Sequence, residues 1–357
     1  MADIPPSFPR DDDSLLPFLR RAILVVAIIS VVGLLLILRD IVLLVFAAVM
    51  VGVALTAAAN AVSKVTRLGH RTSLAIATAL TVIFIGGSLA FIWPIFQEQL
   101  PNLFDRIMVA LGDLEDRIGV TLPENIRELT DSLGGFANQV LAGMLSLAGA
   151  VASALAAFLL VAVAGVFLAA EPQRYRDGVV LLFPIGLHGK VRRAMRQSGE
   201  GLLLWLRAQV IGMLTVGVLV GLGAWAIGLP SGLALGLIAG LAEFVPIIGP
   251  FIAFVPAVLV AFGENTSLLG WTVLLYLVVQ QLEGNVVTPL LQRNIVSMPP
   301  VLLLFSMVAF GFIFGVAGVI VAAPLTVTLY LLVRQLYVRD LLGQEALIDE
   351  VGKERKA

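Results

Sequence analysis

The chain has 357 residues with a formal net charge of −1; 59% of the residues are hydrophobic and only 13% are charged. A soluble protein of this length needs far more charge to cover its surface, so the composition indicates a polytopic all-α membrane protein, and we expect no nucleic-acid partner. The absence of cysteine excludes disulfides and thiolate sites, and the only histidines, His70 and His188, lie in charged loops, so we expect no metal centre within the membrane and no cofactor.

The amino-terminal part of the chain is predicted to be a tail followed by three spans. Residues 1–21 are rich in proline and aspartate without a hydrophobic period, which indicates a disordered cytosolic tail. Residues 22–96 are predicted to form the first three transmembrane helices. The run 22–38 is followed by no small-residue cleavage site and leads through a short charged loop into the run 41–59, so the two form a transmembrane hairpin rather than a signal peptide. A third span covers 74–96.

The middle of the chain alternates between an amphipathic segment and further spans. Between 97 and 140, apolar residues recur at three- and four-residue spacing, and Pro123 opens a second, shorter helix. We therefore expect 97–140 to be an extracytoplasmic amphipathic helical domain. The next span, 141–170, is rich in alanine and glycine, which suits close helix packing. A basic loop, 171–200, leads to a fifth span, 201–229.

Residues 141–334 are predicted to form a transport core around an unusual segment, 230–262. Its long apolar run is broken by the sequence EFVPIIGP, from Glu243 to Pro250. Backbone at membrane depth must satisfy its own hydrogen bonds, so a broken helix survives only if it packs in protein or lines a wet cavity. The segment is too short for two crossings of about 20 residues each and too long for one straight helix. This predicts a re-entrant hairpin that enters from the outer side.

The carboxyl-terminal part contains a second interrupted segment. A span begins at Leu268 and ends in a polar stretch, 280–289. The last apolar stretch, 299–333, is too long for one crossing and is interrupted by glycines and Pro324, so we expect two short spans or a hairpin plus a span. Paired interrupted segments indicate a transport site between repeats, although the sequence leaves an internal duplication open. A charged cytosolic tail, 335–357, closes the chain.

Basic residues predict the orientation by the positive-inside rule. They are concentrated in the amino-terminal tail and in the loops 60–73 and 171–200, whereas 97–140 is mainly acidic. Both termini and these two loops are therefore expected to be cytoplasmic and 97–140 outside. This requires an even number of crossings, and about eight fits best.

The break at Glu243 is the first candidate binding site. Acidic residues within a membrane mark ion or substrate pathways, so Glu243 is predicted to bind a proton or a cation. The alternative is a carboxylate that locks the turn against helix-end amides or an arginine. Pro246 and Pro250 remove amide donors and Gly249 permits a positive φ. The carbonyls freed there could coordinate a cation or accept from a polar solute, or the turn could be purely architectural.

Glu283 and Asn285 form a second polar group, and Pro289 is predicted to end their helix. If Gln280 and Gln281 lie within the inner leaflet, they supply neutral donors and acceptors for a hydroxylated substrate. The alternative is a solvated helix end at the inner interface.

Arg207 lies two turns inside its span, with Gln209 close by. An arginine there either snorkels to the cytosol or pairs with an intramembrane acid, Glu243 or Glu283. Snorkelling is favoured for a residue this near the inner end. No P-loop, glycine-rich dinucleotide loop or Gly-x-Ser-x-Gly sequence occurs in the chain, so neither an enzyme nor an ATP-driven pump is expected.

Several of these motifs together resemble the bacterial autoinducer-2 exporter (AI-2E) family. They are Gly228-Leu-Pro230, the Glu243–Pro250 sequence, Arg207-Ala-Gln209, Glu283-Gly-Asn285-Val-Val-Thr-Pro289 and the Gly311–Pro324 stretch. The family's usual Glu-Asn pair is separated here by Gly284. The resemblance implies a secondary transporter of the bacterial cytoplasmic (inner) membrane with about eight spans. It also implies export of the quorum-sensing signal autoinducer-2 or monovalent cation/proton antiport, and a homo-oligomer, with pentamers and an elevator-like motion among the family's proposed properties.

Three functional hypotheses follow. The leading one is a proton- or ion-coupled exporter of a small polar solute with alternating access around the Glu243 break. The runner-up is a Na⁺(K⁺)/proton antiporter, which needs only carboxylates and carbonyls. The third is a non-transporting membrane scaffold whose 97–140 domain binds partners, and two polar helix breaks at membrane depth argue against it.

Overall fold

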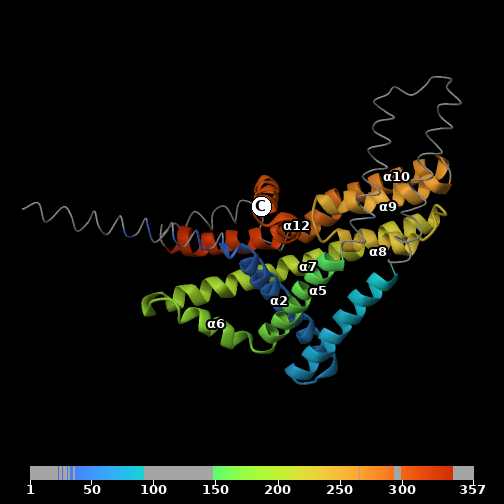
Figure 1. Cartoon of the computed structure of the whole chain (residues 1–357). Helices are drawn as coiled ribbons and strands as arrows, with labels where there is room; N and C mark the ends of the chain where they lie inside the picture. The colour runs from blue at the N-terminus through green and yellow to red at the C-terminus, as the bar shows by residue number, and fades with distance from the viewer. Residues whose placement is uncertain are drawn as a thin grey trace, which may run out of the picture.

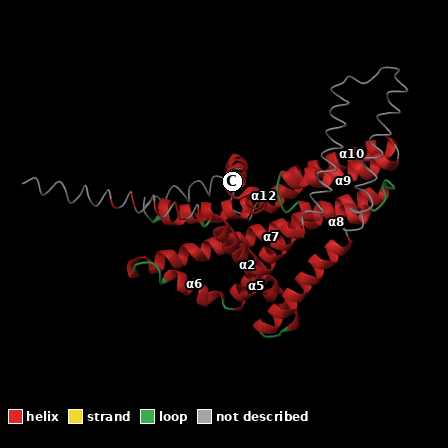
Figure 2. Cartoon of the chain, in the orientation of Figure 1, coloured by secondary structure: helices red, strands yellow, loops and turns green. Residues whose placement is uncertain are grey.

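The computed structural model describes residues 37–91, 148–264, 266–292 and 299–340, together with single positions 23, 26, 30, 33 and 34. Every regular element among these residues is a helix and none is a strand (Figure 2). The predicted amino-terminal tail, the predicted outer domain and most of the predicted carboxyl-terminal tail lie outside the described residues.

Five helical stretches are long and apolar enough to cross a membrane. They are α2 (Arg39–Thr66), the helix His70–Phe91, and the stretches Ile185–Ala226, Ser267–Leu290 and Val301–Arg339. A sixth is counted if α5 (Ala148–Ala170) and α6 (Pro172–Val180), which meet at an angle of 91°, form one broken span. The predicted class, an all-α polytopic membrane protein, is thereby confirmed. The predicted number of crossings depends on residues outside the described ones and stays a prediction.

The remaining elements follow α6 in chain order. They are η1 (Ile185–Leu187), α7 (His188–Ala226), α8 (Gly232–Ala242), α9 (Ile248–Glu264), α10 (Thr266–Leu282), η2 (Glu283–Val287), α11 (Thr288–Gln292), α12 (Pro300–Val333) and η3 (Arg334–Arg339). Helix α7 begins well before the predicted span because its first turns are amphipathic: Val191 and Ala194 are buried while Arg192 and Arg193 are exposed. It runs through the middle of the molecule, with α6 near one end and α9 and α10 near the other (Figure 1).

Helices α7 and α8 pack closely in opposite directions because glycines line both of the facing surfaces. A side chain at Gly236 would meet backbone atoms of Gly217 and Gly221 at 2.5–2.7 Å, and one at Gly240 would meet the Cα of Gly217 at 3.2 Å. Small residues four positions apart let two helix backbones approach in a membrane. The α7–α8 pair is therefore closely packed, and the chain enters the break directly after α8.

Helices α2 and α5 form a second close pair, which runs in parallel. A side chain at Gly52 would meet Leu168 Cβ at 3.0 Å, and one at Gly165 would meet the Ala48 carbonyl at 3.3 Å. The predicted role of the small residues of 141–170 in close packing agrees with this contact.

Helix α12 is interrupted at Gly315, whose φ of 66° and ψ of −151° are not helical. The chain turns back there, so that Gly318 lies against Phe310 and Gly311 lies close to Val319. The interruption expected within 299–333 falls at this glycine. The second half of α12 packs against α7, where a side chain at Gly201 would collide with Leu331.

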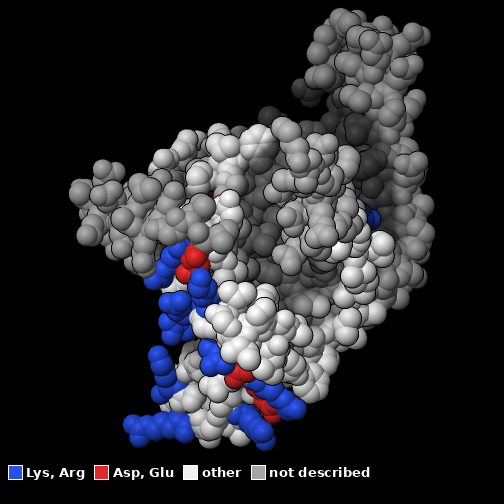
Figure 3. Space-filling view, turned by 90° about the vertical axis from the view of Figure 1, so that its left-hand side faces the viewer, with Lys and Arg blue, Asp and Glu red and all other residues white. Residues whose placement is uncertain are grey.

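On the face shown in Figure 3, the Lys and Arg side chains of the described residues gather mainly along one end. His70 contacts the Ala169 carbonyl at 3.0 Å, Arg192 lies 3.2 Å from Asp177, and Lys190 Nζ donates to the Asp340 carbonyl at 3.5 Å. These contacts bring the end of α2, the α5–α6 corner, the start of α7 and the end of η3 to the same end. This agrees with the expectation that the two basic loops share one side of the membrane.

Candidate functional site

The break between α8 and α9 is a tight turn over residues 243–247. Its backbone remains paired: Val245 N–H donates to the Ala242 carbonyl at 3.0 Å, and Gly249 N–H donates to the Val245 carbonyl at 2.8 Å. Pro246 has no N–H to satisfy, and its carbonyl accepts from Ile248 at 2.8 Å. The turn therefore satisfies the requirement for paired backbone at membrane depth largely by itself.

Glycine is required at position 249 by close contact rather than by its φ. A Cβ there would collide with the Ala242 carbonyl and would lie 3.0 Å from Glu243 N. The positive φ at this turn belongs instead to Ile247, at 71°. The predicted reason for Gly249, a positive φ, is therefore corrected: the end of α8 presses on the start of α9, so a methyl group has no room. Pro250 follows within the first turn of α9, where a missing N–H costs little.

Glu243 lies at the carboxyl end of α8 with only 7% of its surface exposed. Gln209 Nε2 donates to its backbone carbonyl at 2.5 Å, across from α7 to the turn. Of the described residues, no Lys or Arg lies within ion-pair distance of its carboxylate. Gln209, a predicted binding residue, is thus engaged with the backbone of the break, while the Glu243 carboxylate is left for another ligand.

Glu283 lies in the π-helical segment η2, where it accepts two hydrogen bonds from its own chain. Gln280 Nε2 donates to its Oε2 at 3.1 Å, and Thr288 Oγ1 donates to its Oε1 at 2.5 Å. Asn285 Nδ2 donates to Gln281 Oε1 at 2.7 Å and to the Gln281 carbonyl at 3.0 Å. The four predicted residues of this group are therefore joined in two local pairs.

The prediction that Pro289 ends this helix is wrong. The helix continues from α10 through η2 into α11, and Pro289 is the second residue of α11. The π-helical turn before Pro289 changes the pairing of backbone N–H groups with carbonyls. Pro289 therefore lies in the first turn of α11, where the helix does not require an N–H.

The two acidic residues lie within electrostatic range of each other. Burial is the larger influence on the Glu243 carboxyl, and the negative charge of Glu283 is the second. Two carboxylates within range repel each other unless a proton or a cation lies between them. The arrangement can therefore hold a positive charge that neither carboxylate obtains from the described side chains.

Arg207 is not part of this arrangement. Its side chain is exposed on α7, and it forms no ion pair with Glu243 or Glu283. Gln209 follows two residues later on the same helix and contacts the break instead. Of the two predicted alternatives for Arg207, snorkelling fits this exposed position better.

Trp205 and Phe244 were not among the predicted site residues, yet they join the break to the rest of the core. Their rings meet edge to face with centroids 6.0 Å apart. Trp205 belongs to a buried cluster with Ala323 and Val327 of α12, and Phe244 packs on that cluster. The spacing of Trp205 and Gln209 by one helical turn was the available signal, because residues four apart lie on the same helix face.

The family described as "AI-2E family transporter" matches residues 23–337. The chain belongs to this family. The match includes both breaks and the η2 segment, and the resemblance inferred from the motifs is confirmed.

Several relatives of this AI-2E family chain have names that refer to transport. "Putative transport protein YrrI" of Bacillus subtilis is 34% identical over 38% of each chain, so that alignment spans little more than a third of the relative. "Putative transport protein MT0215" of Mycobacterium tuberculosis is 29% identical over 72% of each chain. "Putative permease PerM" of Escherichia coli is 27% identical over 64% of this chain and 63% of the relative. Family and relatives together support a multi-pass membrane transporter.

Proposed function

We propose that this AI-2E family member is an ion-coupled secondary transporter that exports a small polar solute, of the autoinducer-2 type, by alternating access around the broken helix. The observation that carries the proposal is a buried carboxylate, Glu243, at a helix break, within electrostatic range of a second carboxylate, Glu283. A buried carboxylate within range of a second acid is costly in a membrane protein unless it binds something positive during the working cycle.

The break also supports a moving part. The α8–α9 hairpin is joined to α7 at the turn by one side-chain hydrogen bond, from Gln209, and by the Phe244–Trp205 ring contact. Both contacts can be exchanged without unfolding a helix, because the turn pairs its own backbone. We propose that the turn and α9 change their contacts with α7 when the charge on the acidic pair changes, while α8 stays packed on α7 through the facing glycines.

A monovalent cation/proton antiporter is the second candidate, and one observation favours it. The acidic pair is accompanied by amide and hydroxyl groups only: Gln280 and Thr288 bind Glu283, and no described cationic side chain pairs with either acid. Oxygen-rich sites of this kind suit Na⁺ or K⁺ competing with a proton.

The setting of the transporter is proposed from charge and family. We place it in the bacterial cytoplasmic membrane with both termini in the cytoplasm, because the basic end of the molecule carries the loops around Arg71 and Arg192. The proposed partners are the bilayer, a small polar solute, and a proton or a monovalent cation. A homo-oligomer, such as a pentamer, is proposed from the family resemblance.

The test uses the full-length protein in proteoliposomes with a pH indicator inside. Na⁺, K⁺ or a candidate solute is added outside, and the internal pH is followed for the wild type, Glu243→Gln and Glu264→Gln. Glu264 is an exposed carboxylate at the far end of α9, so its variant controls for the loss of one charge. Solute-evoked proton flux that falls at least tenfold in Glu243→Gln alone supports the exporter. Cation-evoked flux with the same dependence supports the antiporter instead.

The scaffold hypothesis makes the opposite prediction. If no cation or solute evokes flux, and if Glu243→Gln fully complements a strain that lacks the protein, both transport proposals are wrong. A wild-type flux that Glu243→Gln leaves unchanged would keep transport but remove the acidic pair from the mechanism.

A further inference from the structure

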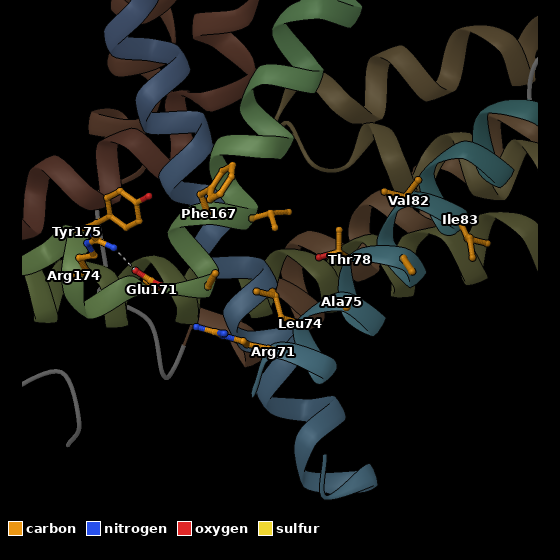
Figure 4. Close-up of a pocket in the computed structure, with 13 residues that line it drawn as sticks. Arg71, Leu74, Ala75, Thr78, Val82, Ile83, Phe167, Glu171, Arg174 and Tyr175 are labelled. Atoms are coloured by element: carbon orange, nitrogen blue, oxygen red, sulfur yellow. Dashed lines mark hydrogen bonds and ion pairs between the residues drawn. The ribbon is translucent and has the colours of Figure 1, made fainter. Parts of the chain in front are cut away.

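A groove of about 900 Å³ lies between the helix His70–Phe91 and the α5–α6 corner, at the basic end of the molecule (Figure 4). It contains none of the acidic pair or the residues of the break. One wall is the helix His70–Phe91, which presents Leu74, Thr78 and Val82 to the groove. The other wall is the end of α5, with Phe167.

The groove has the depth of one membrane leaflet. It extends along the first helix from Arg71 to Ile83, which is about 18 Å at 1.5 Å per residue. Half of the hydrocarbon core of a bilayer is about 15 Å. The groove therefore reaches from the membrane interface to about the middle of the bilayer.

Apolar side chains are uncovered at both levels of the groove. Near the α5–α6 corner Phe167 is 60% exposed, and deeper along the first helix Val82 is 61% and Ile83 is 69% exposed. In a bilayer these surfaces contact acyl chains. An acyl chain that packs in a groove between two helices has more contacts with the protein than one on a flat helix surface.

The shallow end of the groove carries a net positive charge. Arg174 lies 3.1 Å from Glu171 and remains largely exposed, so this end has two arginines against one carboxylate. Arg71 pairs with no described carboxylate, and its side chain extends from its own helix toward the α5–α6 corner (Figure 4). Tyr175 adds an aromatic ring at the same level, where a membrane interface favours it.

We propose that this groove is a binding site for one anionic phospholipid of the inner leaflet. The phosphate lies at Arg71 and Arg174, and one acyl chain extends along Leu74 and Val82 beside Phe167. A free anion would use the arginines but leave the apolar walls uncovered, and a zwitterionic lipid would bring its own cation to an end of the groove that already has a net positive charge. Basic pockets between transmembrane helices on the cytoplasmic side bind anionic head groups by this combination.

The bound lipid would fill the space between the helix His70–Phe91 and α5 beyond their own contacts, which are the buried cluster of Leu74, Ala77 and Ala169 and the bond of His70 to the Ala169 carbonyl. The choice of the inner leaflet rests on the proposed orientation. The choice of an anionic phospholipid rests only on the charge and shape of the groove.

The experiment measures lipid retention by native mass spectrometry on the full-length protein. The delipidated protein in detergent is mixed with phosphatidylglycerol or phosphatidylcholine, and the number of lipids bound per chain is counted. The variants are Arg71→Gln, Arg71→Gln with Arg174→Gln, and Ala79→Trp, which fills the groove without changing its charge. Arg193→Gln removes one exposed positive charge from the same end outside the groove and is the matched control.

The wild type and Arg193→Gln should retain one phosphatidylglycerol and no phosphatidylcholine. Arg71→Gln should bind about fivefold more weakly, and the double variant about 25-fold more weakly, as expected for the loss of one and two basic residues near a lipid head group. Ala79→Trp should lose the lipid as well. An excess of inorganic phosphate should not displace it, because phosphate cannot replace the acyl chain.

Several results would overturn the proposal. They are equal retention by Arg71→Gln and Arg193→Gln, equal retention of the two lipids, undiminished binding to Ala79→Trp, or complete displacement by phosphate. Ala75→Phe serves as a second filling variant if Ala79→Trp does not fold, since Ala75 lines the same wall. Because retention is measured without transport, failure here leaves the proposed transport function untouched.

Discussion

Among the residues that the structure describes, the break after α8 and the break within α12 are built differently. The break after α8 extends over residues 243–247, buries Glu243 and is held to α7 by Gln209. The break within α12 is a single exposed residue, Gly315, in a conformation that other residues avoid, and a Cβ there would contact nothing within 4 Å.

The difference separates a break that carries chemistry from one that only redirects the chain. At the first, Gln209 of α7 binds the backbone of the turn, and the charge of Glu283 in η2 acts on Glu243. At the second, the neighbours are phenylalanines, with Phe310 and Phe314 6.1 Å apart between ring centroids. An interrupted helix at membrane depth is therefore insufficient evidence of a binding site. Polar side chains near the interruption are stronger evidence.

The largest effect on stability is expected at Gly249. Gly249→Ala places a methyl group against the Ala242 carbonyl, so the turn must open, and the free energy of unfolding should fall by about 3 kcal/mol. Gly270→Ala, in open space on α10, should be neutral or slightly stabilising. Thermal unfolding in detergent measures both. Equal melting temperatures for the two variants would show that the first break is as tolerant as an ordinary helix.

At the second break, the cost should be conformational only. Gly315→Ala has room for its methyl group but forces alanine into a region that is nearly exclusive to glycine, so we expect a loss of about 2 kcal/mol. Flux per folded protein should remain within twofold of the wild type, because no polar group is displaced. A variant that folds normally but has lost transport would place function at the second break too, and the contrast between the breaks would fail.

Removal of the hydrogen bond between α7 and the turn should have an intermediate effect. Gln209→Leu leaves the Glu243 carbonyl without this donor and should cost about 1 to 2 kcal/mol. We expect a severalfold change in flux as well, since the bond lies between the hairpin and α7. Thr215→Val on the same helix removes a local hydroxyl bond to Ile211 and should change neither. Indistinguishable flux for the two variants would make the Gln209 bond purely structural.

The smallest expected effect concerns the rings at the two breaks. Phe244→Leu loses the edge-to-face contact with Trp205 and should cost about 1 kcal/mol. Phe314→Leu loses a tilted and more distant contact and should cost about 0.5 kcal/mol. Chemical denaturation in mixed micelles can compare them. A larger loss for Phe314→Leu would mean that the α12 break depends more on its neighbours than its geometry indicates.

The first break was predictable because its causes are local. Proline lacks an N–H and glycine lacks a Cβ, so the cluster of Pro246, Gly249 and Pro250 favours an interruption of the helix at this point of the sequence. The reason for Gly249 was predicted less well, because close contact between the end of α8 and the start of α9 is visible only after both helices are placed. The course of the chain through Pro289 was mispredicted for a similar reason: a π-helical turn has no strong sequence signal.

The sequence by itself determined the class of protein and the position of the first break, since apolar composition, helix length and proline chemistry act locally, and its motifs resembled the transporter family. Only the tertiary structure decided that Gln209 binds the Glu243 carbonyl, 34 positions away, and that Glu283 rather than Arg207 lies within range of Glu243. The physical reason is the glycine contact between α7 and α8, where Gly217 and Gly221 meet Gly236. That contact sets which face of each helix turns inward, and a pairing between two helix faces cannot be deduced from either helix alone.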